Sequence, residues 1–480
     1  MLTINEIQQF IEEDALSEKK SFAMVGKKYY AGLHDIRNYR LFYYNVDGCL
    51  VEDKSRSNIK ISHPFFTEIV DQAVQYMLSG KTGYVKSDIP ELQKELDLYF
   101  NNNESFTSEL YELLTDCMVK GYSYMYAYKN AENRIAFQCA DSTGIVEVRA
   151  KDTDDKTEYV IYWYIDRIEK GYKKIKRIQV WDAEQTYYYV QDGDGKIELD
   201  TSEKINPKPH TLYSNSKDGK IYYEGFGFIP FFRLDNGKEQ VSDLRSIKDL
   251  IDDYDLMSCG LSNNLQDASE YLVVVKGYAG EDLDELQQNI KVKKLIGIDG
   301  DENGGVDFKT VDIPYQARKA KMDEDEKNIY RFGFAFNSAQ VGDGNITNIV
   351  IKSRYALLDM KCNKLEIRLS EFMRKIVKIV LQEINNNMRT NFTQADVYLD
   401  FTREVMTNAQ DNAQIALLQE QTKGQALTNI LNVASQLDDD TILKNICQTL
   451  ELKYEEVAAK AKEKDTNNVL KSIEEIKTEE

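Results

Sequence analysis

The clearest hydrophobic pattern in the chain lies in its C-terminal half, across residues 348–386. Apolar side chains recur there at spacings of three and four, which places them along one face of an α-helix. We therefore expect a very long amphipathic helix whose apolar stripe packs into a core. The stripe consists of Leu358, Cys362, Leu365, Leu369, Phe372, Ile376 and Val380.

Two shorter helical segments precede this helix, at residues 238–268 and 314–335, and residues 269–313 between them read as a small β-containing excursion. A turn-rich loop at residues 336–347 follows the second segment. The first segment has an acidic back, because three aspartates lie near the face opposite its apolar residues. The apolar residues are Leu244, Ile247, Ile251, Tyr254, Leu261 and Leu265, and the acids are Asp249, Asp252 and Asp253.

The N-terminal half mixes two periodicities. Helical spacing occurs within residues 4–34, 64–80 and 105–120, with a polar, loop-like stretch at 47–57. Between residues 122 and 232, short runs rich in Ile, Val, Tyr and Trp alternate with turns, which is typical of an antiparallel meander. A short strand at 396–403 and helical sequence over 409–479 complete an α+β chain that is mainly helical.

Composition narrows the class of protein. The 480 residues suggest about two to four domains. The chain has 61 basic and 81 acidic residues, a net charge of −20, which disfavours a protein that grips DNA tightly through a basic groove. We expect no signal peptide and no transmembrane helix. The six scattered cysteines form no Cys-x-x-Cys pair, as expected for reduced thiols in a cytoplasm.

Enzyme chemistry finds little support. The histidines His34, His63 and His210 share no local motif, so we interpret them as isolated structural or surface residues. Residues 299–304 match the first half of a calcium loop, but its twelfth position is Thr310, which favours a hairpin turn. The chain lacks a Walker motif, the nucleotide-binding loop of ATP-driven motors. If the chain takes part in moving DNA, the energy must come from a partner. We expect no catalytic residue, metal or cofactor; a metal- or nucleotide-dependent enzyme is the less favoured alternative.

Several stretches together resemble the portal proteins of tailed bacteriophages, specifically those of siphophages of Gram-positive hosts. They are residues 225–236 (GFGFIPFFRLDN), 243–254 (DLRSIKDLIDDY), 29–36 (YYAGLHDI), 58–63 (NIKISH), 69–72 (IVDQ) and 355–361 (YALLDMK). They occur in the family's order and span most of the chain. A non-viral ring scaffold or adaptor is the alternative of another class.

The resemblance implies a dodecameric ring around a DNA channel, at one vertex of the virion capsid, made in the bacterial host cytoplasm. Its parts would be a wing with a β-rich meander, a stem, a small β-containing clip, a channel loop and a crown. Carried onto this chain, they are residues 1–237 (wing), 238–268 (first stem helix), 269–313 (clip), 314–335 (second stem helix), 336–404 (channel loop, long helix and return to the wing) and 405–480 (crown and C-terminal tail).

The resemblance also implies partners: copies of the chain itself, the terminase large subunit, major capsid and scaffolding proteins, a head–tail adaptor and double-stranded DNA, with no membrane. Asp249, Asp252 and Asp253 would line the channel, or be solvated surface. Lys291, Lys293 and Lys294 would dock the motor, or only aid solubility. The DNA-facing loop, or else a simple surface turn, would present Asn337, Ser338, Gln340, Gly342, Asp343, Gly344 and Asn345.

Overall fold

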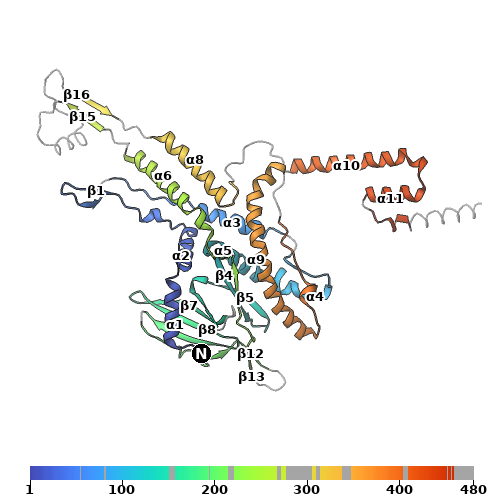
Figure 1. Cartoon of the computed structure of the whole chain (residues 1–480), viewed down its shortest axis with the longest axis horizontal. Coiled ribbons are helices and arrows are strands. Elements are labelled where there is room, and N and C mark those ends of the chain that lie inside the picture. Colours follow the sequence, from blue (N-terminus) through green and yellow to red (C-terminus); the bar gives the residue numbers. More distant parts are fainter. Residues whose placement is uncertain are drawn as a thin grey trace, which may run out of the picture. The chain divides into compact units, whose positions relative to one another are not determined.

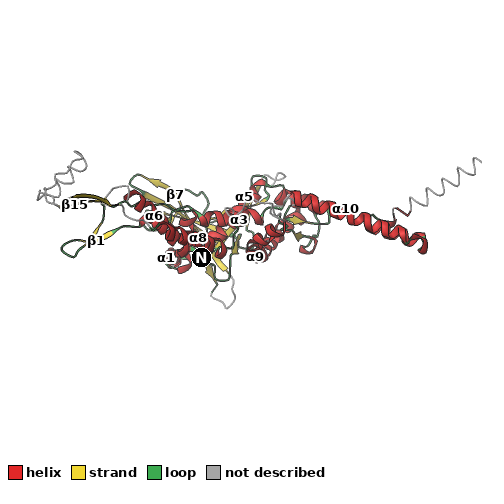
Figure 2. Cartoon of the chain, turned by 90° about the horizontal axis from the view of Figure 1, so that it is seen from above, coloured by secondary structure: helices red, strands yellow, loops and turns green. Residues whose placement is uncertain are grey.

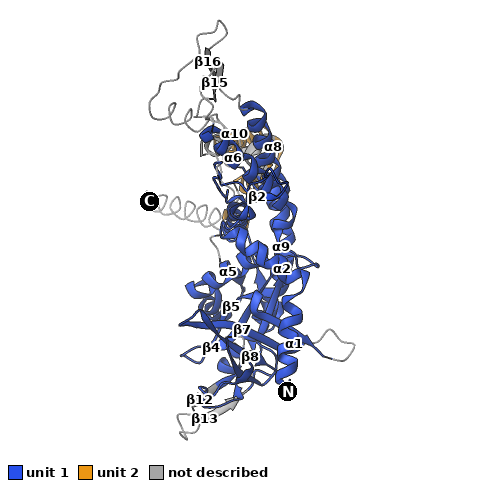
Figure 3. Ribbon diagram, turned by 90° about the vertical axis from the view of Figure 1, so that its left-hand side faces the viewer, with its two compact units in different colours: residues 1–342, 355–404 blue, residues 343–354, 405–480 orange. Residues whose placement is uncertain are grey.

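The computed structural model describes most of the chain (Figure 1). The described residues are 1–54, 56–80, 83–150, 157–193, 195–214, 221–267, 272–276, 305–309, 314–337, 348–403, 409–450, 452–455 and 457–458. Helices and strands are both abundant, as the α+β prediction requires (Figure 2). The chain divides into two compact units (Figure 3): Met1–Gly342 with Tyr355–Glu404, and Asp343–Arg354 with Val405–Glu480.

The N-terminal helices of the first unit begin and end at recognisable signals. Thr3 and Glu6 form a capping box at the start of the first helix, and Asn103 caps the fifth. Gly121 ends the fifth helix at φ +89°, where a Cβ would lie 2.5 Å from the carbonyl oxygen of Gln240. The helices are α1 Ile4–Ala15, α2 Glu18–Tyr30, α3 Phe65–Met77, α4 Pro90–Leu96 and α5 Glu104–Lys120.

The predicted meander is confirmed as an antiparallel sheet in which the strands lie in the order β10-β9-β8-β7-β6, with β11 also paired to β9. Its core includes Ile161, Ile178 and Val180, and Ile7 of α1 packs against them. The strands are β6 Ile145–Arg149, β7 Thr157–Glu169, β8 Lys173–Trp181, β9 Gln185–Asp192, β10 Ile197–Leu199 and β11 Lys208–Pro209. We call this the meander sheet.

A second, three-stranded sheet places β4 between β14 and β5, and α5 packs against it. The strands are β4 Tyr122–Lys129, β5 Ile135–Ala140 and β14 Phe231–Asp235. Three further pairs of strands are β1 Phe42–Tyr44 with β2 Leu50–Glu52, β3 Val85–Lys86 with β17 Tyr398–Leu399 from the C-terminal half, and β12 Thr211–Ser214 with β13 Ile221–Glu224. The predicted loop at 47–57 is therefore wrong in part, because β2 pairs with β1 across a turn.

The long helix is confirmed as α9 Asn348–Met388. Every member of its predicted apolar stripe is buried, from Leu358 to Val380. The stripe packs on α3: the thiol of Cys362 lies 3.8 Å from the carbonyl oxygen of Ala73, and Tyr76 donates a 2.6 Å hydrogen bond to Asp359. These two contacts join α9 to α3, and the apolar stripe of α9 is itself buried.

The helices on either side of the excursion are α6 Lys248–Asp267 and α8 Tyr315–Phe332, which lie side by side (Figure 1). They run antiparallel, because Ser246 hydrogen-bonds to the carbonyl of Phe332 at one end while Lys321 reaches Asp253 further along. Of the excursion, the structure describes β15 Leu272–Lys276 paired with β16 Gly305–Lys309. The predicted β content of this excursion is thus confirmed, and the rest of 269–313 lies outside the described residues.

The predicted start of the first of these helices is wrong by ten residues. Residues 238–242 form a turn in which Gln240 has φ +55°, and the hydroxyl of Ser242 accepts a hydrogen bond from the amide of Leu244. A short 3-10 turn, Asp243–Ser246, then leads into α6. Of the apolar stripe predicted for residues 238–268, the side chains of Leu244, Ile247 and Ile251 are buried, but Leu265 near the end of α6 is 56% exposed.

The second unit is helical where it is described, as predicted for this part of the chain. It contains α10 Ala409–Asn432 and α11 Asp439–Thr449, and Asp438 caps α11 through the amide of Thr441. Residues 459–480 lie outside the described residues. Throughout the described ranges, no helix combines the length and apolar character needed to cross a bilayer.

Candidate functional site

The three acids predicted to line a channel have different environments on α6. Asp249 is exposed, whereas Asp252 and Asp253 are half-buried. Lys248 lies 2.6 Å from Asp252, and Lys321 of α8 lies 2.6 Å from Asp253. Of these three acids, Asp249 is the one that is exposed, and among the described residues it has no lysine paired with it.

Asp252 belongs to a network that ties α6 to the N-terminal segment. Tyr29 at the end of α2 donates a hydrogen bond to Asp252. Lys248, which also contacts Asp252, donates a hydrogen bond of 2.7 Å to Asp35. Burial would lower the pKa of Lys248, but its bonds to Asp252 and Asp35 outweigh that effect and raise the pKa. Lys248 therefore stays charged and acts as a bridge.

One turn further along α6, Asp255 is fully buried and forms the centre of a polar joint. Its Oδ2 lies 2.6 Å from Nδ1 of His34, and its Oδ1 lies 2.7 Å from Nδ1 of His63 and 3.0 Å from the amide of His63. An ionised carboxylate can only accept hydrogen bonds, so both imidazoles must carry a proton on Nδ1. We call these three residues the His–Asp–His joint.

The joint holds a negative charge in the interior. Burial alone would raise the pKa of Asp255, but the hydrogen bonds from His34 and His63 outweigh it and lower the pKa below its ordinary range. The ring of Tyr29 stacks on His34 with centroids 4.5 Å apart, and Tyr254 meets the edge of His63 at 4.8 Å. The carboxylate is therefore ionised, and an aromatic ring packs against each of the two histidines that bind it.

The interpretation of the histidines as isolated residues is wrong for two of them. His34 and His63 share one carboxylate, which follows them in sequence by 221 and 192 residues. No local motif signals such a pairing. The third, His210, lies between Trp181 and Phe226, and its burial lowers its pKa. It is consistent with a structural role.

A second polar link joins α6 to α8. Lys321 contacts both Asp253 and Asp325, and Asp325 is 2% exposed. Hydrogen bonds to Asp253 and then Asp325 raise the pKa of Lys321. One ammonium group thus neutralises an acid on each helix and fixes their relative position along the pair.

The start of the predicted channel loop is tethered on two sides. Phe336 exchanges backbone hydrogen bonds of 3.1 and 2.9 Å with the side chain of Gln72 in α3, and Asn337 donates a 3.0 Å bond to Glu326 in α8. The other predicted loop residues, Ser338, Gln340, Gly342, Asp343, Gly344 and Asn345, lie outside the described residues, as do Lys291, Lys293 and Lys294.

This arrangement suits mechanical support better than catalysis. Within the described ranges, no group of three or more His, Cys, Asp or Glu side chains is arranged to hold a metal ion. In the His–Asp–His joint, both carboxylate oxygens already accept imidazole N–H groups, so the imidazole Nδ1 atoms have no lone pair to offer a metal. The described polar groups position helices.

Comparison with known proteins gives a consistent result. The family model described as "Phage portal protein, SPP1 Gp6-like" matches residues 10–470. The portal protein of Bacillus phage SPP1 is 26% identical over 404 residues, which cover 83% of this chain and 77% of that protein. The portal protein of Clostridium phage phiCD119 is 22% identical over 427 residues, which cover 86% of this chain and 89% of that protein.

Proposed function

The chain belongs to the family of SPP1 Gp6-like phage portal proteins, and on that premise we propose that copies of it form a dodecameric ring around a DNA channel. The protein is a phage portal protein, a structural component that sits at a capsid vertex. In our proposal the ring nucleates capsid assembly with the major capsid and scaffolding proteins, admits the genome, and later joins a head–tail adaptor for ejection.

The observation that carries this proposal is the antiparallel pair α6–α8. One side of the pair is tied to the rest of the first unit by Asp252 and Asp255, while Asp249, Asp323 and Glu324 remain exposed. Repeated around a ring, exposed carboxylates would repel phosphate and keep DNA from adhering to the wall. Salt limits this repulsion to a Debye length of about 8 Å, so it acts only near the wall.

The geometry sharpens the proposed lining. We assign the DNA-facing role on α6 to Asp249, and we assign Asp252 and Asp253 a role in holding α6 against its neighbours. Their contacts with Lys248 and Lys321 support that division. A lysine in place of Asp252 or Asp253 would be repelled by Lys248 or Lys321 of the same chain. The three acids look alike in sequence, but we assign them two different roles.

Two further parts of the proposal rest on the sequence and the family. The loop beginning at Asn337 would project into the channel and touch DNA, with Gly342 and Gly344 giving it freedom to move. Lys291, Lys293 and Lys294 would dock the terminase motor, which supplies the energy because the chain has no Walker motif. Charge reversal at these lysines should weaken terminase pull-down without dispersing the ring.

Mass measurement of the purified chain tests the ring directly. We expect a single species with the mass of twelve chains of 55.5 kDa each, and negative-stain images should show rings with a central hole. A stable monomer that remains monomeric at every protein concentration would overturn the proposal. A ring with another copy number would correct the stoichiometry and leave the channel in place.

A further inference from the structure

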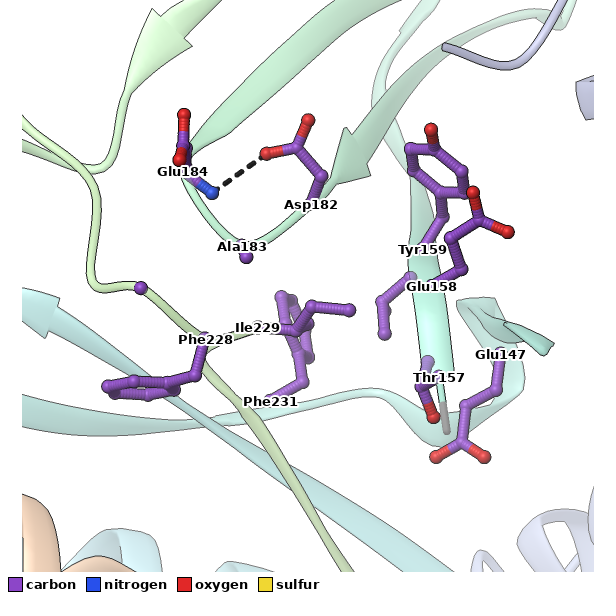
Figure 4. A pocket seen from close by; sticks show the side chains of 12 residues that line it. Glu147, Thr157, Glu158, Tyr159, Asp182, Ala183, Glu184, Phe228, Ile229 and Phe231 are labelled. Carbon is purple, nitrogen blue, oxygen red and sulfur yellow. Dashed lines mark hydrogen bonds between the residues drawn. The ribbon is translucent and has the colours of Figure 1, made fainter. Parts of the chain in front are cut away.

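The meander sheet carries a pocket at one of its ends (Figure 4). Its volume is about 640 Å³, and it lies where β7 begins and where β8 turns into β9. The apolar side chains Phe228, Ile229 and Phe231 form its floor. Figure 4 shows Ile229 and Phe231 between two groups of acidic side chains, one of which comes from the β8–β9 turn.

The mouth of this pocket is negatively charged. Four acids line it, and no lysine, arginine or histidine is among the described residues that do so; one positive group, the N-terminal ammonium of Met1, donates a 2.9 Å hydrogen bond to the hydroxyl of the lining residue Tyr159. Glu147 is paired with Arg233. One carboxylate oxygen of Asp182 accepts hydrogen bonds from the backbone amides of Glu184 and Gln185. Glu158 and Glu184 are exposed, so they supply most of the charge that an approaching group would meet.

The opposite end of the same sheet carries a basic, aromatic projection. We call residues 168–174, the turn between β7 and β8 with its flanks, the finger. Tyr172 at its tip is 89% exposed and Ile168 is 62% exposed. Lys170 and Lys174 are exposed beside them. Gly171 and Tyr172 both have positive φ, +81° and +59°, as in a tight hairpin turn that places Tyr172 at its tip.

The finger and the pocket cannot meet within one chain. The pocket lies at the first residues of β7 and the finger follows its last, and the strand Thr157–Glu169 has 13 residues. At about 3.3 Å per residue, roughly 40 Å separate the two ends. The finger of one chain therefore cannot enter the pocket of that same chain.

We propose that the finger of one copy of the chain inserts into the pocket of the next copy. Tyr172 would cover the apolar floor, and Lys170 and Lys174 would lie against Glu158 and Glu184. A closed ring needs this kind of contact, because each copy must present one surface to the copy before it and a different one to the copy after it. The inference rests on the proposed ring and names the surfaces that join its subunits in the wing.

Charge favours a second copy as the occupant. A chain with net charge −20 repels its copies at long range. The finger is a local exception: Lys173 is paired with Asp192 and Glu169 with Arg167, so Lys170 and Lys174 are its exposed charges, and the pocket offers the opposite sign. Complementary charged patches guide two copies into one relative arrangement and disfavour arrangements in which like charges meet.

Charge reversal tests the contact. A pocket variant, Glu158→Lys with Glu184→Lys, and a finger variant, Lys170→Glu with Lys174→Glu, should each raise the concentration at which rings dissociate by on the order of tenfold, about 1.4 kcal/mol. The matched control Lys94→Glu with Lys204→Glu changes two exposed lysines elsewhere and should leave this concentration unchanged.

Combining both reversals in one chain separates a lost contact from a damaged fold. The charges are then complementary again, so ring stability should recover toward that of the wild type. A combined variant weaker than either parent would overturn the inference. So would pocket and finger variants whose rings dissociate at the same concentration as the wild type.

Cross-linking provides a second readout. In a Cys49→Ser background, Tyr172→Cys with Glu184→Cys should give a ladder of linked chains with a thiol-specific cross-linker, and either cysteine alone should give far less. If wild-type rings form but no ladder appears, the inference fails and the ring stands. If wild-type protein never forms rings, the proposed function itself fails. Capture of the finger by a different protein while ring stability stays unaltered would also overturn the inference.

Discussion

The helices α9 and α6 are held in the first unit by opposite kinds of contact. Residues 358–380 of α9 bury a continuous stripe of hydrocarbon, with Leu369, Ile376 and Val380 fully covered. In the first half of α6, by contrast, the buried carboxylate of Asp255 accepts hydrogen bonds from two histidines, and Lys248 bridges Asp252 and Asp35. One contact depends on shape and volume, and the other depends on charge and direction.

Two kinds of contact therefore act in one subunit: close packing around α9, and directional polar bonds that hold α6. Apolar packing is strong but non-directional, so neighbouring side chains can shift to fill small gaps. Hydrogen bonds to a carboxylate require particular distances and angles, so they fix the position of α6 more exactly. We therefore expect α9 to be sensitive to side-chain volume and α6 to be sensitive to charge.

The largest effect should come from the apolar region. Leu365→Ala removes a side chain that is 3% exposed and leaves a cavity, so the free energy of unfolding should fall by about 2–5 kcal/mol. Ile367 on the same helix is 74% exposed, and Ile367→Ala should change it by less than about 0.5 kcal/mol. Urea denaturation measures both. Equal losses at the two positions would show that the helix is oriented differently.

The His–Asp–His joint should show the next largest effect. Asp255→Asn keeps the size of the side chain but turns an NH₂ group toward an imidazole N–H, so stability should fall by about 1.5–3 kcal/mol. Asp249→Asn, on the exposed side of the same helix, is the matched control and should have little effect. A loss at Asp249 as large as at Asp255 would remove the distinction between them.

Acid should weaken the same joint. The pKa of Asp255 is lowered in the folded chain, so its contribution is complete above the unfolded pKa of about 3.9 and is lost as the pH falls through the folded value. The stability difference between the wild type and Asp255→Asn should therefore be full near pH 7 and shrink below about pH 4. A difference that stayed constant to about pH 2 would show that this carboxylate does not titrate with unfolding.

The link between α6 and α8 should contribute less. Asp253 and Lys321 are 37% and 44% exposed, so Asp253→Asn should cost only about 0.2–1 kcal/mol. The cost should disappear at about 1 M salt, where the Debye length is about 3 Å. Asp323→Asn on α8 is the control. A loss that persists in high salt would indicate a buried role for Asp253.

The smallest effect on stability should accompany the largest effect on function. Asp249→Lys should leave the free energy of unfolding within about 0.5 kcal/mol, because the side chain is exposed. In the ring, however, each copy would add an attraction for phosphate, and packaged DNA should fall below that of Asp249→Asn. Nuclease-protected genome length measures this. Full packaging by the lysine variant would remove Asp249 from the channel wall.

Periodicity explains which parts of the fold could be predicted. The stripe of α9 and the strands around Ile161 and Ile178 repeat at helical and strand spacings, so a few neighbouring residues define them. The start of α6 was missed because Gln240 and Ser242 form a turn through local hydrogen bonds inside a stretch with helical spacing. The apolar end of that helix was misplaced because burial there depends on the neighbouring elements.

The candidate site was harder to predict for a physical reason. Asp249, Asp252, Asp253 and Asp255 look alike in sequence, and their roles are set by partners such as Tyr29, Lys321 and His34, which lie far away along the chain. Aspartates near one another on a helix predict an acidic face. They do not tell which charge is paired, because the pairing residues follow from the tertiary fold.

A three-dimensional reconstruction of the assembled ring by electron microscopy would show which elements form the wall of the channel. We predict that α6 and α8 stand in the wall of a central channel, that Asp249 faces the lumen, and that Asp255 remains bonded to His34 and His63 on the side away from DNA. A ring whose channel is lined by other elements, with Asp249 on its outer surface, would contradict this account.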